Sequence, residues 1–109
     1  MAKTDALHGS LDLLVLKILS RRPQLHGYAI MAAIASTSGE VLRAEEDSLY
    51  PAPYRMEEAG WIRAEWIKKG TDRCAPVYIL TAAGKRQLGA EVSRWQSVSF
   101  AINGVLREA

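Results

Sequence analysis

The chain has 109 residues, of which 49% are hydrophobic and 24% charged, and its formal net charge is +2. This length excludes two independent cores, and the apolar fraction excludes intrinsic disorder. We expect neither a transmembrane helix nor a secretory signal, because the apolar runs are short. Cys74 is the single cysteine, which excludes an internal disulfide and a multi-cysteine metal site. A cytoplasmic protein fits these features.

Two helices are predicted before residue 40. Asp5 is expected to cap a first helix that continues to about Arg21. Leucines and valine occupy nearly all of its faces, which favours burial against a partner subunit as well as against the core. The break at 22–24 separates it from a second helix over about 26–37, which ends at Ser38-Gly39.

A third helix is predicted from Asp47, as its N-cap, to about residue 59, with Gly60 following its last turn. Pro53 lies inside this helix, and we therefore expect its first turns to be distorted or 3₁₀-like. The positions expected to face the core are Leu49, Ala52, Met56 and Ala59.

A hairpin follows, with strands predicted over 61–67 and 77–80 and a polar, basic loop over 68–73 between them. Pro76 cannot donate a ladder hydrogen bond, so the second strand is expected to be an edge strand there. Trp61 and Trp66 fall on opposite faces, and we expect one of them in the core.

A long final helix is predicted from a Thr81 cap to about Arg107. Its apolar residues recur at heptad-like spacing, interrupted by Ser99. So small a protein cannot cover the whole seam, and a second copy of the chain is the simplest cover. The seam residues are Leu88, Val92, Trp95, Ile102 and Leu106.

This element order is that of a winged helix-turn-helix. The fold expected is mainly α with a small β-hairpin: residues 1–80 form the DNA-binding domain, and residues 81–109 form a dimerisation helix packed with the first helix. Hydroxyls and guanidinium groups can bind phosphates or base edges, although an ordinary exposed helix face and a solvated hairpin tip remain alternatives. The candidate DNA-binding residues are Ser48, Tyr50, Pro51, Tyr54 and Arg55 of the third helix and Lys68, Lys69 and Arg73 of the hairpin.

Several separated motifs resemble the PadR family of transcriptional regulators over nearly the whole chain. They are Leu7-His8-Gly9-Ser10-Leu11-Asp12-Leu13-Leu14, Leu25-His26-Gly27-Tyr28, Ser48-Leu49-Tyr50-Pro51-Ala52, Gly60-Trp61-Ile62 and Tyr78-Ile79-Leu80-Thr81-Ala82-Ala83-Gly84. The single C-terminal helix is similar to the short subgroup of that family.

The resemblance implies a homodimeric repressor of a pseudo-palindromic operator, in which Tyr28 and Tyr50 approach the DNA backbone. It also implies relief of repression by a small aromatic or amphipathic effector near Trp95. That indole either stacks on a planar ligand or packs in the dimer seam. The expected neighbours in such an effector pocket are Leu13, Leu16, Val92, Ser99 and Ile102.

No catalytic constellation, cofactor motif or metal-ligand spacing is present, and we expect neither an enzyme nor a membrane protein. His8 and His26 are expected in hydrogen bonding or packing, and Cys74 is expected to be inert. The alternative function is a winged-helix dimer that binds proteins or sequesters small molecules without specific DNA binding. The excess of acids over 40–58 favours this alternative, whereas the basic hairpin tip favours DNA.

Overall fold

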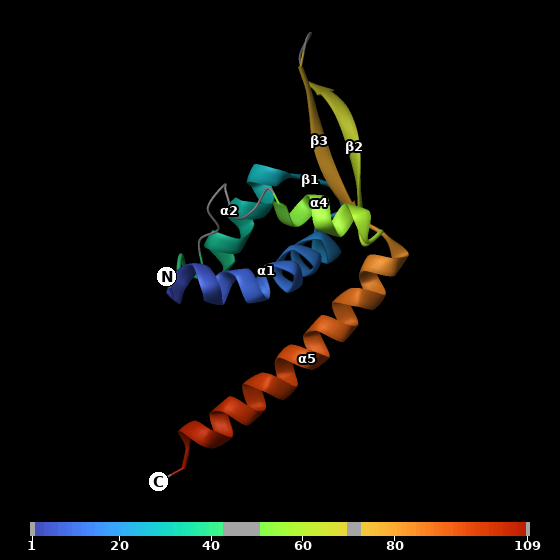
Figure 1. Cartoon of the computed structure of the whole chain (residues 1–109). Helices are drawn as coiled ribbons and strands as arrows, with labels where there is room; N and C mark the ends of the chain where they lie inside the picture. The colour runs from blue at the N-terminus through green and yellow to red at the C-terminus, as the bar shows by residue number, and fades with distance from the viewer. Residues whose placement is uncertain (1, 43–50, 70–72, 109) are drawn as a thin grey trace.

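The computed structural model describes residues 2–42, 51–69 and 73–108, and three helices pack around a small sheet from which a long helix departs (Figure 1). This arrangement confirms the mainly α fold with a small β-sheet. The elements are α1 (Ala2–Arg21), β1 (Leu25–His26), α2 (Gly27–Thr37), α4 (Pro51–Glu58), β2 (Ile62–Lys69), β3 (Arg73–Leu80) and α5 (Ala82–Leu106).

The core forms where α1, α2, α4 and the start of β2 meet. On α1, Leu11, Val15 and Leu19 recur every four residues and therefore lie on one face, which is buried. Met56 of α4 is buried as expected, whereas Ala59 is exposed, because the helix has ended before it. The buried cluster consists of Leu11, Val15, Leu16, Leu19, Ile30, Ile34, Met56 and Ile62.

The ends of the helices follow the local sequence, with one exception. Gly39 and Gly60 adopt φ of 63° and 82°, and each closes the preceding helix. At the second site the amide of Trp61 donates to the carbonyl of Met56 at 2.9 Å, as in a Schellman motif. The exception is the Asp5 cap, which is wrong: α1 begins at Ala2, since Ala2 and Lys3 are strong helix formers.

From residue 51 onward the expected distortion or 3₁₀-like turn near Pro53 is absent from the described helix, whereas the predicted first turn at 47–50 lies outside the described residues. Residues 51–58 are α-helical throughout. The described part of α4 therefore continues through Pro53 without a break. The expected Asp47 cap and Leu49 lie outside the described residues.

The sheet has three antiparallel strands in the order β1-β3-β2, so β3 is the central strand. At Pro76, however, β3 has only β2 beside it, as predicted for that position. Pro76 is accommodated, because the ladder with β1 pairs Leu25 with Tyr78 and His26 with Val77 and stops one residue before it.

The hairpin of β2 and β3, which we call the wing, is longer than predicted. The strands continue to Lys69 and begin again at Arg73, and these two residues are paired. The expected loop over 68–73 therefore contributes three of its residues to the ladder. A polar composition marked the turn but did not limit the pairing, since charged side chains are tolerated on exposed strands.

A tight junction joins the sheet to α5. Thr81 caps the helix as predicted: its hydroxyl accepts a bond from the amide of Gly84 at 3.0 Å and donates to the carbonyl of Gly60 at 2.6 Å. Gly84 is buried directly against the Trp61 carbonyl. This junction sets the direction in which α5 leaves the sheet.

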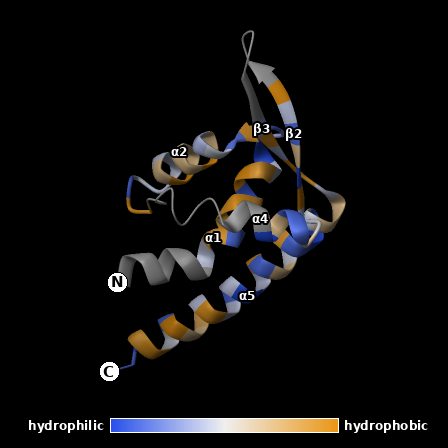
Figure 2. Ribbon diagram, turned by 45° about the horizontal axis from the view of Figure 1, so that its top comes forward, coloured by the Kyte–Doolittle hydropathy of each residue, from blue (hydrophilic) through white to orange (hydrophobic). Residues whose placement is uncertain are grey.

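Beyond this junction α5 diverges from the other elements, and the principal extents of the chain are 63 × 28 × 21 Å. Figure 2 shows apolar residues along the C-terminal half of α5, and the side chains of Ile102, Val105 and Leu106 there are exposed. Within the described part of the chain, no helix combines the length and apolarity needed to cross a membrane.

The junction makes a direct prediction for Gly84→Ala. A Cβ there would lie 2.0 Å from the Trp61 carbonyl oxygen, a backbone atom that cannot move independently. We expect the free energy of unfolding to fall by at least about 3 kcal/mol in thermal melts followed by circular dichroism. Gly89→Ala is the control, because its Cβ would meet nothing within 4 Å, and it should gain about 1 kcal/mol. Equal melting temperatures for the two variants would contradict the close contact between Gly84 and the Trp61 carbonyl.

Candidate nucleic-acid interface and apolar groove

Tyr28 lies in the first turn of α2 with 63% of its surface exposed. Its ring stacks on His26, with the ring centroids 5.8 Å apart and the planes inclined by 10°. His26 is itself held by Nδ1, which donates to the carbonyl oxygen of Pro76 at 2.9 Å. The side chain of His26 thus bonds to β3 rather than to the start of α2, and Tyr28 is held at the N-terminus of α2 by the sheet.

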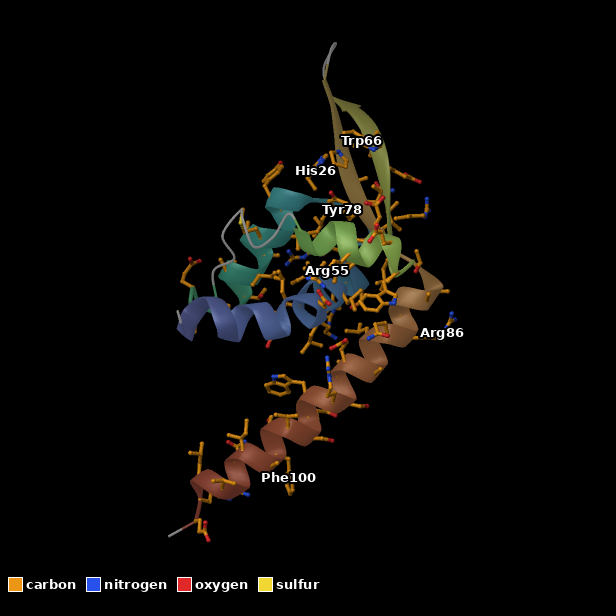
Figure 3. All side chains as sticks on the ribbon, viewed as in Figure 1. His26, Arg55, Trp66, Tyr78, Arg86 and Phe100 are labelled. Atoms are coloured by element: carbon orange, nitrogen blue, oxygen red, sulfur yellow. The ribbon has the colours of Figure 1, made fainter. Side chains whose placement is uncertain are left out.

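Arg55 of α4 lies against α1, as Figure 3 shows. Its guanidinium donates two hydrogen bonds of 3.2 Å to the two carboxylate oxygens of Asp12, whose side chain is only 24% exposed. Such a bidentate pair fixes the orientation of both groups. The pair holds α4 to α1 and leaves half of the Arg55 side chain exposed, and the nucleic-acid contact of Arg55 stays a prediction.

Four further DNA-binding candidates come from the third predicted helix. The backbone places Pro51 and Tyr54 on α4, whereas Ser48 and Tyr50 lie outside the described residues. The packing of Met56 in the core orients this helix with one face inward. The DNA contacts of these four residues remain predictions.

The wing brings its three basic candidates to one end of the hairpin. Lys69 pairs with Arg73 on the last rung before the turn, and Lys68 pairs with Cys74 on the rung before it. The three basic positions are therefore adjacent at the tip of the hairpin. Closely spaced cationic positions favour phosphate contact because binding releases condensed counterions. The backbone thus supports the expected location of the basic patch.

A groove of about 330 Å³ runs between α1 and α5. On its polar side the carboxylate of Glu91 accepts hydrogen bonds from Gln87, at 2.8 Å, and from Arg94. The remaining wall is largely apolar and includes the half-exposed indole of Trp95. The lining residues are Ser10, Leu13, Glu91, Arg94, Trp95 and Val98.

Of the residues predicted around an effector, Trp95 and Leu13 line this groove. Leu16 does not: it is completely buried in the core, because α1 directs two faces inward rather than one. That assignment is wrong. Val92, Ser99 and Ile102 lie along α5 outside the lining of the groove.

One face of α5 stays uncovered. Trp95, Ile102 and Leu106 are 53%, 52% and 75% exposed, and Val98 and Val105 on the same face are exposed by half or more. These residues recur at spacings of three and four and form one continuous apolar stripe. From here on, the seam means this exposed stripe, residues 95, 98, 102, 105 and 106. Leu88 and Val92 of the predicted seam are partly buried and are not included.

Comparisons with known proteins agree with this geometry. A family model described as the transcriptional regulator PadR-like family matches residues 15–90. The chain belongs to the PadR-like family of transcriptional regulators. The predicted family is therefore confirmed.

Solved structures are similar over most of the chain. A transcriptional regulator from Clostridium thermocellum is 24% identical, covers 92% of this chain and 96% of its own, and superposes with a TM-score of 0.84. A PadR family regulator from Eggerthella lenta is 27% identical over 96% of this chain and 88% of its own, with a TM-score of 0.82. Bacillus subtilis PadR, solved in complex with operator DNA, is 27% identical over 75% of this chain and 46% of its own, with a TM-score of 0.68.

Membership in the PadR-like family also bears on chemistry. The family consists of transcriptional regulators, which confirms the expectation that the chain is not an enzyme. Among the residues that the structure describes, no three His, Cys, Asp or Glu side chains come close enough to hold a metal ion.

Two residues of this PadR-like regulator are not identified by the sequence reasoning. The sequence shows Asp12 only as part of a helix, and no local signal connects it with Arg55, which lies 43 residues away. Alternation along the strand does not decide whether Trp66 faces the core or the surface, and the structure places it on the wing with 67% of its surface exposed. Trp61 is the half-buried member of the pair and packs against the core, as expected of one of them.

Proposed function

We propose that this PadR-like regulator binds operator DNA as a homodimer, represses transcription, and responds to a small aromatic or amphipathic effector in the groove beside Trp95. The observation that carries the proposal is the uncovered seam of α5. The winged helix of residues 1–80 is the DNA-binding unit, and residues 81–109 are the dimerisation helix.

The exposed surface of the chain supports self-association. Its accessible area is 7491 Å², whereas a folded monomer of 12.0 kDa exposes about 6,000 Å². The excess is larger than the roughly 800 Å² that each partner contributes to an interface of standard size. A second α5, packed along the seam, covers Trp95 and the aliphatic residues that follow it, and α1 supplies the adjoining surface.

The placement of Tyr28, α4 and the wing supports DNA as the partner. The similar B. subtilis protein was solved with operator DNA, and its fold matches this chain over three quarters of its length. In a dimer, two α4 helices enter successive major grooves about 34 Å apart, which requires a pseudo-palindromic operator. Arg55 holds α4 to α1 through Asp12, and its half-exposed guanidinium is a candidate for contact with the DNA.

The groove between α1 and α5 supports the effector site. Trp95 presents an indole to the groove, and the neighbouring Glu91 supplies a carboxylate. A planar ligand stacked there contacts the two helices whose packing relates the two protomers. It changes DNA affinity only by binding one arrangement of the protomers more tightly than the other.

A second candidate is a dimer that sequesters small molecules without specific DNA binding. The groove favours it, because the Trp95 site requires no DNA contact. A gel shift against the DNA upstream of the protein's own gene separates the two functions. A specific shift supports the repressor, and its absence at low salt supports the sequestering dimer.

The wing makes the first prediction for DNA binding. Changing Lys68, Lys69 and Arg73 together to Ala should weaken operator binding and lower the slope of log K against log salt by about 0.9 for each phosphate that is no longer neutralised. Fluorescence anisotropy with labelled duplex at several salt concentrations measures both quantities. Arg86→Ala, an exposed cation on α5, is the control and should leave the slope unchanged. An unaltered slope in the triple variant would remove the wing from the mechanism.

The groove makes the second prediction. A planar aromatic cation should quench the tryptophan fluorescence of the protein, and Trp95→Ala should reduce the quench because the stacking surface is removed. Trp66→Phe is the matched control: it also removes one indole, but from the wing, and should retain the quench that comes from the groove. If Trp95→Ala responds like the control, the effector does not bind beside Trp95.

A further inference from the structure

A second cleft lies where three elements meet: the end of α1, the end of β3 and the start of α5. Its volume is about 230 Å³. Of the residues that the structure describes, none lines both this cleft and the groove beside Trp95. Lys85, which lines the cleft, precedes Trp95 by ten residues, a separation of about 15 Å along a helix. The cleft is therefore separate from the groove and from the seam.

Among the described residues, the walls of this cleft are apolar and include no aromatic ring. They are formed by Leu19, Pro23, Ile79 and Leu80. Leu19 is buried and Leu80 packs against the core, whereas Ile79 is partly exposed and does not belong to the core cluster. An apolar ligand in the cleft would remove the exposed part of Ile79 from water, which is favourable. The absence of a ring favours an aliphatic ligand over a stacked planar one.

Two cations line the same cleft from different helices. Arg21 lies in the last turn of α1 and Lys85 in the first turn of α5, and both residues are exposed. Within the described chain neither side chain has an ion-pair partner, and no acid lines the cleft. Ser20 also lines it, but its hydroxyl already donates to the carbonyl of Lys17 at 2.6 Å. The cleft therefore offers two unneutralised cations beside an apolar wall.

The groove beside Trp95 has the opposite character. It presents an indole and the carboxylate of Glu91, whereas the cleft presents aliphatic side chains and cations. The two sites therefore select ligands of different charge and shape. DNA is a poor occupant of the cleft, because a chain of phosphates leaves the apolar wall uncovered. Leu80 also lies seven residues from Arg73 at the wing tip, about 23 Å along the strand.

We propose that this cleft binds a short aliphatic carboxylate, with the carboxylate between Arg21 and Lys85 and the alkyl chain against Leu19, Ile79 and Leu80. A guanidinium can donate two parallel hydrogen bonds to a carboxylate, and an ammonium adds a further charge-assisted bond. The bound ligand joins the end of α1 to the start of α5, next to the junction that sets the direction of α5. This inference goes beyond the proposed function, because it requires neither DNA nor a dimer.

Hexanoate is the probe, titrated into the ¹⁵N-labelled full chain and followed by two-dimensional NMR. We expect saturable shifts of the amide signals of Arg21, Ile79 and Lys85, with a dissociation constant on the order of 1 mM, the range for so small a ligand. Acetate lacks the alkyl chain and hexanol lacks the charge. Each should bind at least about tenfold more weakly than hexanoate.

Substitutions at the two cations test the assignment directly. Arg21→Gln and Lys85→Gln should each weaken hexanoate binding about fivefold, because each removes a charge-assisted hydrogen bond. The matched controls are Arg22→Gln and Arg86→Gln, which remove neighbouring exposed cations that do not line the cleft. Figure 3 shows Arg86 directed away from the helical body. Both controls should bind hexanoate like wild type, and unchanged amide spectra without ligand verify that each variant is folded.

Several results would overturn the inference. One is the absence of saturable shifts, and another is equal affinity of wild type and the Arg21→Gln/Lys85→Gln double variant. Equal binding of hexanoate and hexanol, or of hexanoate and acetate, would reject an amphipathic site. Shifts confined to residues around Trp95 would place the ligand in the groove instead. Every measurement is made without DNA, so such a failure leaves the proposed function standing, and a failure to bind the operator leaves the cleft standing.

Discussion

The apolar seam of α5 is larger than the rest of the described chain covers, and the proposed dimer depends on this uncovered surface. The helix is anchored at one end by the Thr81 cap and the close contact of Gly84 with Trp61, and it then leaves the core. Exposed indole and aliphatic surface along 95–106 is unfavourable in water. A seam held in a fixed direction by a rigid junction is suited to set the separation between two copies of the winged helix.

The same junction links the parts that are proposed to contact DNA. Gly60 and Trp61 end α4 and begin β2, and Thr81 bonds to the carbonyls of both residues. The Asp12–Arg55 pair holds α4 to α1, and α1 contributes Leu13 to the groove beside Trp95. A ligand in the groove therefore contacts elements that are directly connected to α4, and no long relay is needed to couple the two sites.

Much of this architecture could be predicted from sequence, because it depends on local signals. Helix ends at Gly39 and Gly60 and the cap at Thr81 follow from residues within one turn of each other. Contacts between distant segments could not be predicted in this way. The two residues of β1 have no periodicity of their own and become a strand only by pairing with β3. Leu16 has the same helical spacing whether it faces a groove or the core, and the approach of Arg55 to Asp12 depends on how two helices pack.

The central claim is that the α5 seam is an interface between two copies of the chain. Sedimentation velocity on wild type, Ile102→Asp and Ser97→Asp tests it most directly, because the first substitution places a carboxylate in the seam and the second places one on the opposite face of the same helix. The account predicts a dimer for wild type and Ser97→Asp and a folded monomer, or a much weaker dimer, for Ile102→Asp. A well-folded monomer for wild type at micromolar concentration, or an unchanged dimer for Ile102→Asp, would contradict it.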